Sequence, residues 1–152
     1  MPKVTRTSVF INADRDHVFS YVKDLNRMAE WRGDGIKVEK VTPGIVGIGS
    51  KFKVEGDGAG KKGHAEITIS DYEFPLRFAY SVTDEKGSYE HLIDFHMKDS
   101  GTVFDQSVTS KAPMFSGLFG KKGVGSPPTK AALQTLKAKL EQPVSTESAK
   151  AL

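Results

Sequence analysis

Histidine is the side chain best suited to proton transfer near neutral pH, and this sequence of 152 residues has four. They are His17, His64, His91 and His96. His91 and His96 lie five positions apart in a stretch where apolar and polar residues alternate. Their side chains therefore leave a strand on opposite faces and cannot share a metal ion. Cysteine is absent, which excludes thiolate ligands and disulfides. We predict no metal site and no cofactor.

His91 is the best candidate for a polar group inside the protein, because it has the parity of Tyr89 and Ile93 on the apolar face of its strand. With Tyr80, Tyr89 and Gln106 it could orient a polar oxygen of a ligand. It could also act as a general base, with a tyrosine donating to the developing oxyanion. The alternative is a core histidine whose ring nitrogens bond to neighbouring groups. The residues alone leave these interpretations open.

Residues 58–63, GAGKKG, match the letters of the dinucleotide-binding pattern G-x-G-x-x-G. That pattern needs a helix directly after it, whose N-terminus binds phosphate, and residues 65–69 alternate as a strand instead. A Walker loop is also excluded, since Lys62 stands where serine or threonine is required. We predict a hairpin tip here and no nucleotide site.

These side chains need a scaffold, and the sequence predicts a single α+β domain over residues 1–142. Asp14 is placed to cap the first helix, and turn residues separate a row of strands further along. The predicted order is a strand at 3–11, helices at 14–24 and 26–31, six strands within 36–110 and a helix at 127–142.

The predicted sheet has one apolar face and one polar face. In several strands apolar residues occupy every second position, with charged residues between them. The covered face is expected to include Phe78, Tyr80 and Met97. In the strand at 3–11 both parities carry apolar residues, so its inner face stays open. Such a sheet needs helices to cover its apolar side.

The last predicted helix has marked boundaries. Ser126 is placed to cap it with Pro127 at its first position, and leucines between 133 and 140 form an apolar stripe. Pro143 ends it. Residues 143–152 are poor in large apolar side chains, and we predict that they form a disordered tail.

A set of short segments, in a particular order, carries a resemblance to a known family. They are Ile11-Asn12-Ala13 with Val18-Phe19, Asp24-Leu25-Asn26 to Trp31, Gly47-Ile48-Gly49-Ser50, Tyr72 to Phe78, Gly101-Thr102, and Leu136-Lys137 to Leu140-Glu141. Over residues 3–142 the chain resembles the START-like (SRPBCC) superfamily, specifically small bacterial proteins grouped with polyketide cyclases and dehydrases. The resemblance implies a helix-grip, Bet v 1-like fold, in which a seven-stranded antiparallel sheet wraps around a long C-terminal helix.

The resemblance also implies an apolar cavity between the sheet and the last helix. A cavity lined by aromatic rings and a few hydroxyl groups suits a planar or acyl ligand, such as a lipid, a quinone or a polyketide-like molecule. The residues expected to contact the ligand are Trp31, Phe52, Ile67, Ile69, Phe78, Tyr80, Tyr89, His91, Ile93, Gln106, Phe115, Phe119 and Leu133.

Residues 114–125 depart from the family pattern. Four glycines followed by Pro127-Pro128 disfavour the continuous helix that relatives have here. Three interpretations stay open: a lid over the cavity, a weak peripheral membrane contact through Lys121 and Lys122, or a plain loop whose apolar residues pack at the rim.

The net charge of +3 is too small to indicate nucleic acid as a partner. The basic excess lies in residues 111–152, with seven lysines against two glutamates. No apolar stretch approaches the length of a membrane span, and the first residues do not read as a signal peptide, so we predict a cytoplasmic protein.

The sequence leaves three functions open. The first is binding of a small hydrophobic ligand in the internal cavity. The second is an enzyme of the polyketide cyclase or dehydrase type that acts on a ligand in the same place. The third is an interaction protein that uses the basic C-terminal region. The oligomeric state also stays open.

Overall fold

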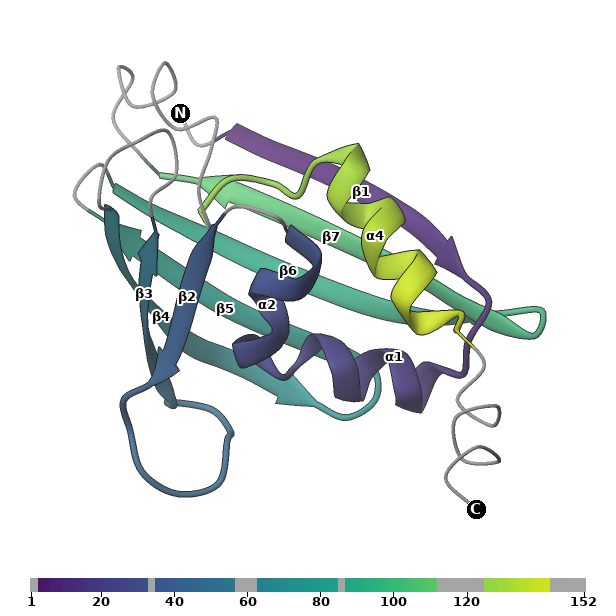
Figure 1. Cartoon of the computed structure of the whole chain (residues 1–152), viewed down its shortest axis with the longest axis horizontal. Coiled ribbons are helices and arrows are strands. Elements are labelled where there is room, and N and C mark those ends of the chain that lie inside the picture. The colour runs from purple at the N-terminus through teal and green to yellow at the C-terminus, as the bar shows by residue number, and fades with distance from the viewer. Residues whose placement is uncertain (1–2, 33–34, 57–62, 85–86, 112–124, 143–152) are drawn as a thin grey trace.

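One antiparallel sheet forms the body of the protein (Figure 1). The computed structural model describes residues 3–32, 35–56, 63–84, 87–111 and 125–142. In the described chain the strand order is β1-β7-β6-β5-β4-β3-β2, so chain neighbours pair from β2 to β7 and β1 pairs with β7. The strands are β1 (Lys3–Ile11), β2 (Ile36–Lys40), β3 (Lys51–Gly56), β4 (Gly63–Glu73), β5 (Arg77–Asp84), β6 (Gly87–Lys98) and β7 (Gly101–Ser110). The predicted row of strands is confirmed.

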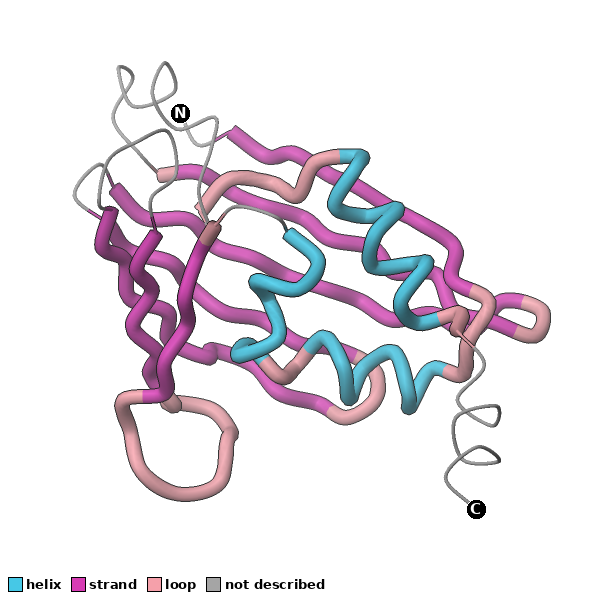
Figure 2. The backbone as a smooth tube through the Cα atoms, in the orientation of Figure 1, coloured by secondary structure: helices cyan, strands magenta, loops and turns pink. Residues whose placement is uncertain are grey.

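The helices of the described chain lie over one face of this sheet, which we call the inner face (Figure 2). They are α1 (Arg15–Val22), the 3-10 helix η1 (Leu25–Arg27), α2 (Met28–Arg32) and α4 (Lys130–Leu140). Helix α1 contacts β6 and β7, η1 and α2 contact β2, and α4 contacts β1 and α2. Helix α2 thus lies between the short strand β2 and the C-terminal helix.

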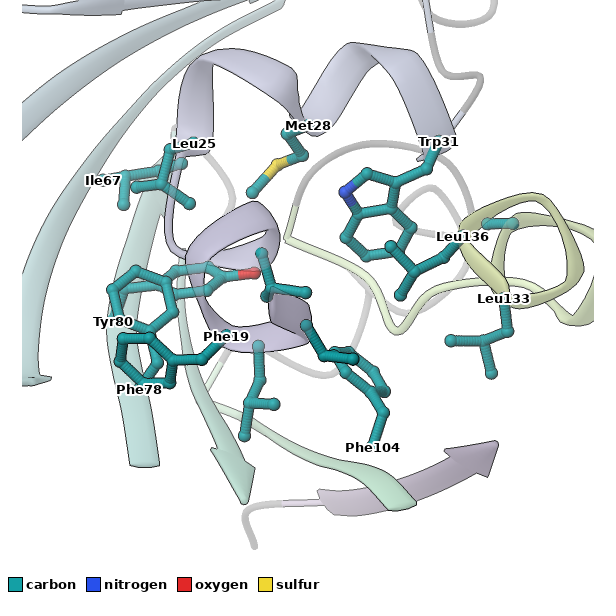
Figure 3. Close-up of a cluster of buried hydrophobic side chains, with 14 of the residues drawn as sticks. Phe19, Leu25, Met28, Trp31, Ile67, Phe78, Tyr80, Phe104, Leu133 and Leu136 are labelled. Carbon is teal, nitrogen blue, oxygen red and sulfur yellow. The ribbon is translucent and has the colours of Figure 1, made fainter. Parts of the chain in front are cut away.

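The inner face and the helices enclose an apolar core (Figure 3). Phe19 of α1 meets Phe78 of β5 edge to face, with ring centroids 6.2 Å apart. Trp31 of α2 meets Phe104 of β7 in the same way, at 6.3 Å. Leu136 of α4 is completely buried beside them. Because aromatic pairs prefer such edge contacts, these rings help fix where the helices sit on the sheet.

The last helix begins later than predicted. Thr129, not Ser126, is its N-cap, and the Thr129 hydroxyl accepts a hydrogen bond of 3.0 Å from the Ala132 amide. Pro127 and Pro128 explain the difference, because a residue that precedes proline is driven away from the helical conformation. The prediction of a helix starting at residue 127 with a Ser126 cap was wrong.

The two N-terminal helices match the prediction in order and approximate place. Asp14 occupies the N-cap position of α1, but its side chain makes no capping hydrogen bond. The single short helix predicted at 26–31 is present as η1 and α2 in succession. The chain changes from 3-10 to α geometry at Met28.

Two predictions about the faces of strands are settled by burial. In β1, Val9 packs against the core and Ile11 is buried, so the odd-numbered positions face inward. The placement of Met97 on the covered face was wrong, since its side chain is 67% exposed. Phe95 packs against Phe19 of α1, and Met97 lies beyond this contact, next to the β6–β7 turn.

Several sequence predictions fall on residues that the structure does not describe. These are residues 58–62 of the GAGKKG segment, the segment 112–124 with Phe115, Phe119, Lys121 and Lys122, and the tail at 143–152. Strand β4, which begins at the last glycine of the GAGKKG segment, is described. The prediction of a strand rather than a phosphate-binding helix at this point is confirmed.

Candidate functional site

A small group of polar side chains lies inside the apolar core. Tyr80 of β5 pairs with His91 of β6, and Gln106 of β7 pairs with Ile93, two residues further along β6. All three side chains are therefore on the inner face of adjacent strands, and each is at most 1% exposed. Arg32, at the end of α2, is also buried. We call these four residues the inner polar cluster.

His91 is held by hydrogen bonds at both ring nitrogens. Its Nε2 lies 3.1 Å from the Gly125 carbonyl oxygen, and its Nδ1 lies 2.9 Å from Nε2 of Gln106. A carbonyl oxygen only accepts, so Nε2 carries the hydrogen and donates it to Gly125. Nδ1 then accepts from the Gln106 amide. Both positions are filled in the neutral imidazole.

The charge state of His91 agrees with this geometry. Burial, together with the positive charge of Arg32, lowers the pKa of His91 from 6.5 to about 3, and the bond to the Gly125 carbonyl opposes this only in part. A base with so low a pKa is too weak to take a proton efficiently near neutral pH. The geometry therefore disfavours a general-base role for His91 and fits a hydrogen-bonding role.

Tyr80 stacks on the His91 ring, with centroids 4.7 Å apart and an interplanar angle of 10°. Burial raises the pKa of the Tyr80 hydroxyl, while the charge of Arg32 and the Gln106 amide act in the opposite direction. Tyr80 is thus a neutral phenol, and its hydroxyl points toward the middle of the core (Figure 3). It can both donate and accept a hydrogen bond.

Arg32 fixes the chain that leads into α4. Its Nη2 donates a hydrogen bond of 3.1 Å to the Ser126 carbonyl oxygen. The neighbouring Gly125 bonds to His91 and packs so closely on Tyr89 that an added Cβ would lie 2.5 Å from the ring. The inner polar cluster and the segment 125–126 therefore hold each other in place.

Gln106 has one polar atom without a partner. Its Nε2 bonds to His91, but its Oε1 is buried and makes no hydrogen bond within the part of the chain that the structure describes. Leaving a buried acceptor unpaired costs about 1–3 kcal/mol. This oxygen is the atom of the cluster best placed to accept a bond from a bound molecule.

The other candidates from the sequence are distributed around the cluster. Tyr89 is buried on the inner face of β6, against Gly125, and burial raises the pKa of its hydroxyl. Phe115 and Phe119 lie outside the described residues. The remaining apolar candidates are all buried in the same core, namely Trp31, Phe52, Ile67, Ile69, Phe78, Ile93 and Leu133.

Arg32 and Gly125 were missed by the sequence reasoning. Arg32 ends a short helix, where a basic residue is ordinarily exposed and placed near the negative end of the helix dipole. Its bond to Ser126 spans 94 positions of the chain, which no local pattern reports. The one available signal was the glycine directly before Ser126-Pro127-Pro128, because glycine allows a close approach, here by the Tyr89 ring.

The described residues contain neither a metal cluster nor a membrane-spanning helix. Within these ranges no three histidine, aspartate or glutamate side chains come together in a way that could hold a metal ion. No helix in the described part of the chain is both long enough and apolar enough to cross a membrane.

The fold defines a class of protein. A seven-stranded antiparallel sheet that grips a C-terminal helix is the helix-grip, Bet v 1-like fold that the resemblance implied. The family described as polyketide cyclase / dehydrase and lipid transport matches residues 1–141. The chain belongs to this family, which confirms the resemblance seen in the sequence.

Three solved structures with the same fold share little sequence with this chain. The crystal structure of Ara h 8.0201 is 14% identical, with a TM-score of 0.68, and the match covers 94% of this chain and 100% of that one. Protein CV1439 from Chromobacterium violaceum is 15% identical, with a TM-score of 0.69 over 92% of this chain and 98% of that one. Protein Ms6760 from Mycobacterium smegmatis is 15% identical, with a TM-score of 0.69 over 92% of this chain and 91% of that one. A comparison with curated proteins finds no match.

Proposed function

We propose that this chain binds a small, largely apolar ligand between the inner face of the sheet and helices α2 and α4. The family description, which includes lipid transport, supports a ligand of this kind. The apolar residues on the inner face support it as well, because burying apolar surface contributes about 25 cal/mol per Å² before ordering costs are subtracted. The apolar body of the ligand would supply the affinity.

This proposal rests on the observation that Oε1 of Gln106 has no hydrogen-bond partner among the described residues. Tyr80 lies in the same cluster, and the Gln106 amide lowers the pKa of its hydroxyl, against the larger effect of burial. A ligand hydroxyl placed between them would donate to Oε1 of Gln106 and accept from the Tyr80 hydroxyl. The ligand we propose therefore carries a hydroxyl or phenol group at the end that enters the cluster.

Binding is favoured over catalysis by the state of His91. The cyclase or dehydrase alternative would need a base near neutral pH, and burial and Arg32 hold the pKa of His91 far below that range. A neutral His91 with both nitrogens bonded is instead suited to orienting the Gln106 amide. Its role in this proposal is that of a positioning residue.

A matched pair of aromatic probes tests the polar contact. We expect the protein to bind naphthol more tightly than naphthalene, because only naphthol can donate to Oε1 of Gln106. In Gln106→Leu this preference should fall about three- to tenfold, the range of a single hydrogen bond. Fluorescence titration of both probes measures it. Unfolding in urea checks that the variant remains folded.

Gln134→Leu is the control, since it makes the same substitution at an exposed position of α4. It should leave the naphthol preference unchanged. Equal preference in Gln106→Leu and in the original protein would contradict the polar contact. Failure of both probes to bind, together with no organic compound in solvent extracts of the purified protein by mass spectrometry, would contradict ligand binding altogether.

A further inference from the structure

Exposed apolar side chains are frequent on the connections at one end of the strands. The β2–β3, β4–β5 and β6–β7 connections follow the same end of their strands, because the strands run antiparallel in sequence order, and they are spread along this edge from the β2–β3 loop at the lower left to the β6–β7 turn at the far right (Figure 1). Of the nine large apolar side chains that are exposed in the described residues, six belong to these connections or their flanks. They are Val41, Ile45, Ile48, Phe74, Leu76 and Met97.

The β2–β3 loop is the most apolar of these connections. Residues 41–50 contain no charged side chain, and Ile45 is 98% exposed and Ile48 68% exposed. Exposed apolar residues scattered singly are ordinary, whereas a concentration of them at one place indicates an interaction site. The loop therefore needs an explanation that the core does not supply.

Hydrogen bonds hold the backbone of this loop while its isoleucines face the solvent. The Gly49 amide donates to the Ile69 carbonyl at 2.8 Å, and the Ser50 amide donates to the Gly47 carbonyl at 3.0 Å. The Lys51 amide donates to the Thr42 hydroxyl at 3.0 Å, closing the loop at its base. The apolar tip is thus a built feature of the fold, because its shape does not depend on burying Ile45 or Ile48.

Lysines stand at both ends of the loop. Lys40 ends β2, and its ammonium donates to the Gly44 carbonyl; Lys51 begins β3 and forms a half-exposed ion pair with Glu66 at 3.4 Å. An uncharged apolar tip with ammonium groups at its base is complementary to a phospholipid surface, where phosphates lie above acyl chains.

We propose that this end of the sheet docks on a phospholipid bilayer. Ile45 and Ile48 enter the acyl region, and Lys40 and Lys51 lie at the level of the phosphates. Leu76 of the β4–β5 connection, 44% exposed, lies further along the same edge, while Phe74 beside it packs edge to face on Phe19 of α1 at 5.2 Å. Apolar groups on separate connections suit a fluid acyl phase, whereas a protein partner would have to match each one in shape.

This docking surface is separate from the inner polar cluster. It also differs from the membrane contact through Lys121 and Lys122 that the sequence analysis left open, which lies outside the described residues. Docking does not require that the interior bind any ligand. The two proposals can therefore fail independently.

Flotation with vesicles of phosphatidylcholine and phosphatidylglycerol tests the docking. We expect the full chain to float with the vesicles, and Ile45→Ser with Ile48→Ser to weaken partitioning about tenfold or more. Val4→Ser is the matched control, because Val4 is 58% exposed but lies near the opposite end of the sheet. It should partition like the original protein.

A second measurement reports insertion directly. Tryptophan fluorescence of Ile45→Trp should shift to the blue on addition of vesicles and be quenched by brominated lipids. The buried Trp31 of the original protein, which is 4% exposed, gives the background to subtract. Lys51→Gln should weaken binding only when phosphatidylglycerol is present, since its contribution is electrostatic.

Three outcomes would overturn the proposal. The first is no flotation of the original protein, and the second is equal flotation of the double serine variant. The third is self-association in analytical ultracentrifugation that the double variant abolishes, without vesicle binding, because the surface would then join two copies of the chain. The preference for naphthol over naphthalene is measured separately for each variant. Failure of vesicle docking can therefore be distinguished from failure of ligand binding.

Discussion

Gln106 and Ile45 are opposite exceptions to the usual distribution of side chains. Gln106 is a polar residue that is 0% exposed, with one acceptor that has no partner in the described part of the chain, whereas Ile45 is an apolar residue that is 98% exposed. The first lies on the inner face of the sheet and the second at its end. Burial of an unpaired polar atom and exposure of an apolar side chain both cost free energy in the isolated chain.

The difference between the two regions lies in what would relieve each cost. The inner polar cluster gains from a donor carried by an apolar molecule, because the rest of its surroundings is already apolar. The sheet end gains from an apolar phase bordered by phosphate, because its lysines are already at the surface.

Truncating the ordinary core between these regions should have the largest effect on stability. Leu136 is completely buried on the inner side of α4, so Leu136→Ala should lower the free energy of unfolding by about 2–5 kcal/mol. Urea denaturation measures this loss. A loss below about 1 kcal/mol would mean that α4 is loosely packed. Gln106 and Ile45 would then no longer contrast with a well-packed core.

The pH dependence of stability should identify the neutral His91. Its pKa falls from 6.5 in the unfolded chain to about 3 in the folded protein, so between these values only the unfolded chain is protonated there. The contribution of His91 to the free energy of unfolding should therefore stay constant above pH 6.5. Below that pH it should fall by about 1.4 kcal/mol per pH unit. Urea midpoints across this range measure the slope.

His91→Gln should remove this part of the pH dependence whatever its own effect on stability. His96→Gln is the matched control, because the His96 side chain is 58% exposed on the outer face of the same strand. If His96→Gln flattened the profile and His91→Gln did not, the assignment of a neutral, buried His91 would be wrong.

Gly125→Ala should disturb the inner polar cluster through the backbone segment that bonds to His91. The new Cβ would lie 2.5 Å from the Tyr89 ring, which is itself buried, so Gly125 must move and lengthen its bond to His91. Overpacking of this kind costs about 1–3 kcal/mol. Gly47→Ala, where nothing lies within 4 Å of the added Cβ, should cost much less in the same urea experiment. Equal costs would show that the contact with Tyr89 is not rigid.

The fold could be predicted because its signals are local. Alternation of apolar and polar residues with turn residues between them marked the strands, and the leucine stripe marked α4. The predicted start of α4 was wrong because Pro127 and Pro128 disfavour helical geometry directly after Ser126, the predicted cap. The prediction that Met97 is covered was wrong for another reason. Alternation tells which face of the sheet a side chain is on, but not how far along the strand the helices cover that face.

The candidate site could be predicted only where it depends on strand parity. Parity placed Tyr80, His91 and Gln106 on the inner face, as the structure has them. It could not place Arg32, whose burial depends on a contact with Ser126 far along the chain. The turn residues Pro43, Gly44 and Gly47 around Ile45 mark a connection between strands, but they do not tell how exposed its side chain is.

The smallest stability effect is also the sharpest test of the comparison. Ile45→Ser should change the free energy of unfolding by no more than about 0.5 kcal/mol, because its side chain is almost fully exposed and the loop is held by backbone hydrogen bonds. The same substitution, with Ile48→Ser, should weaken vesicle binding strongly. Thermal and urea unfolding without lipid measure the first quantity. If Ile45→Ser destabilised the protein as much as a core truncation does, Ile45 would be packed in solution, and the sheet end would no longer be an exception that requires a partner.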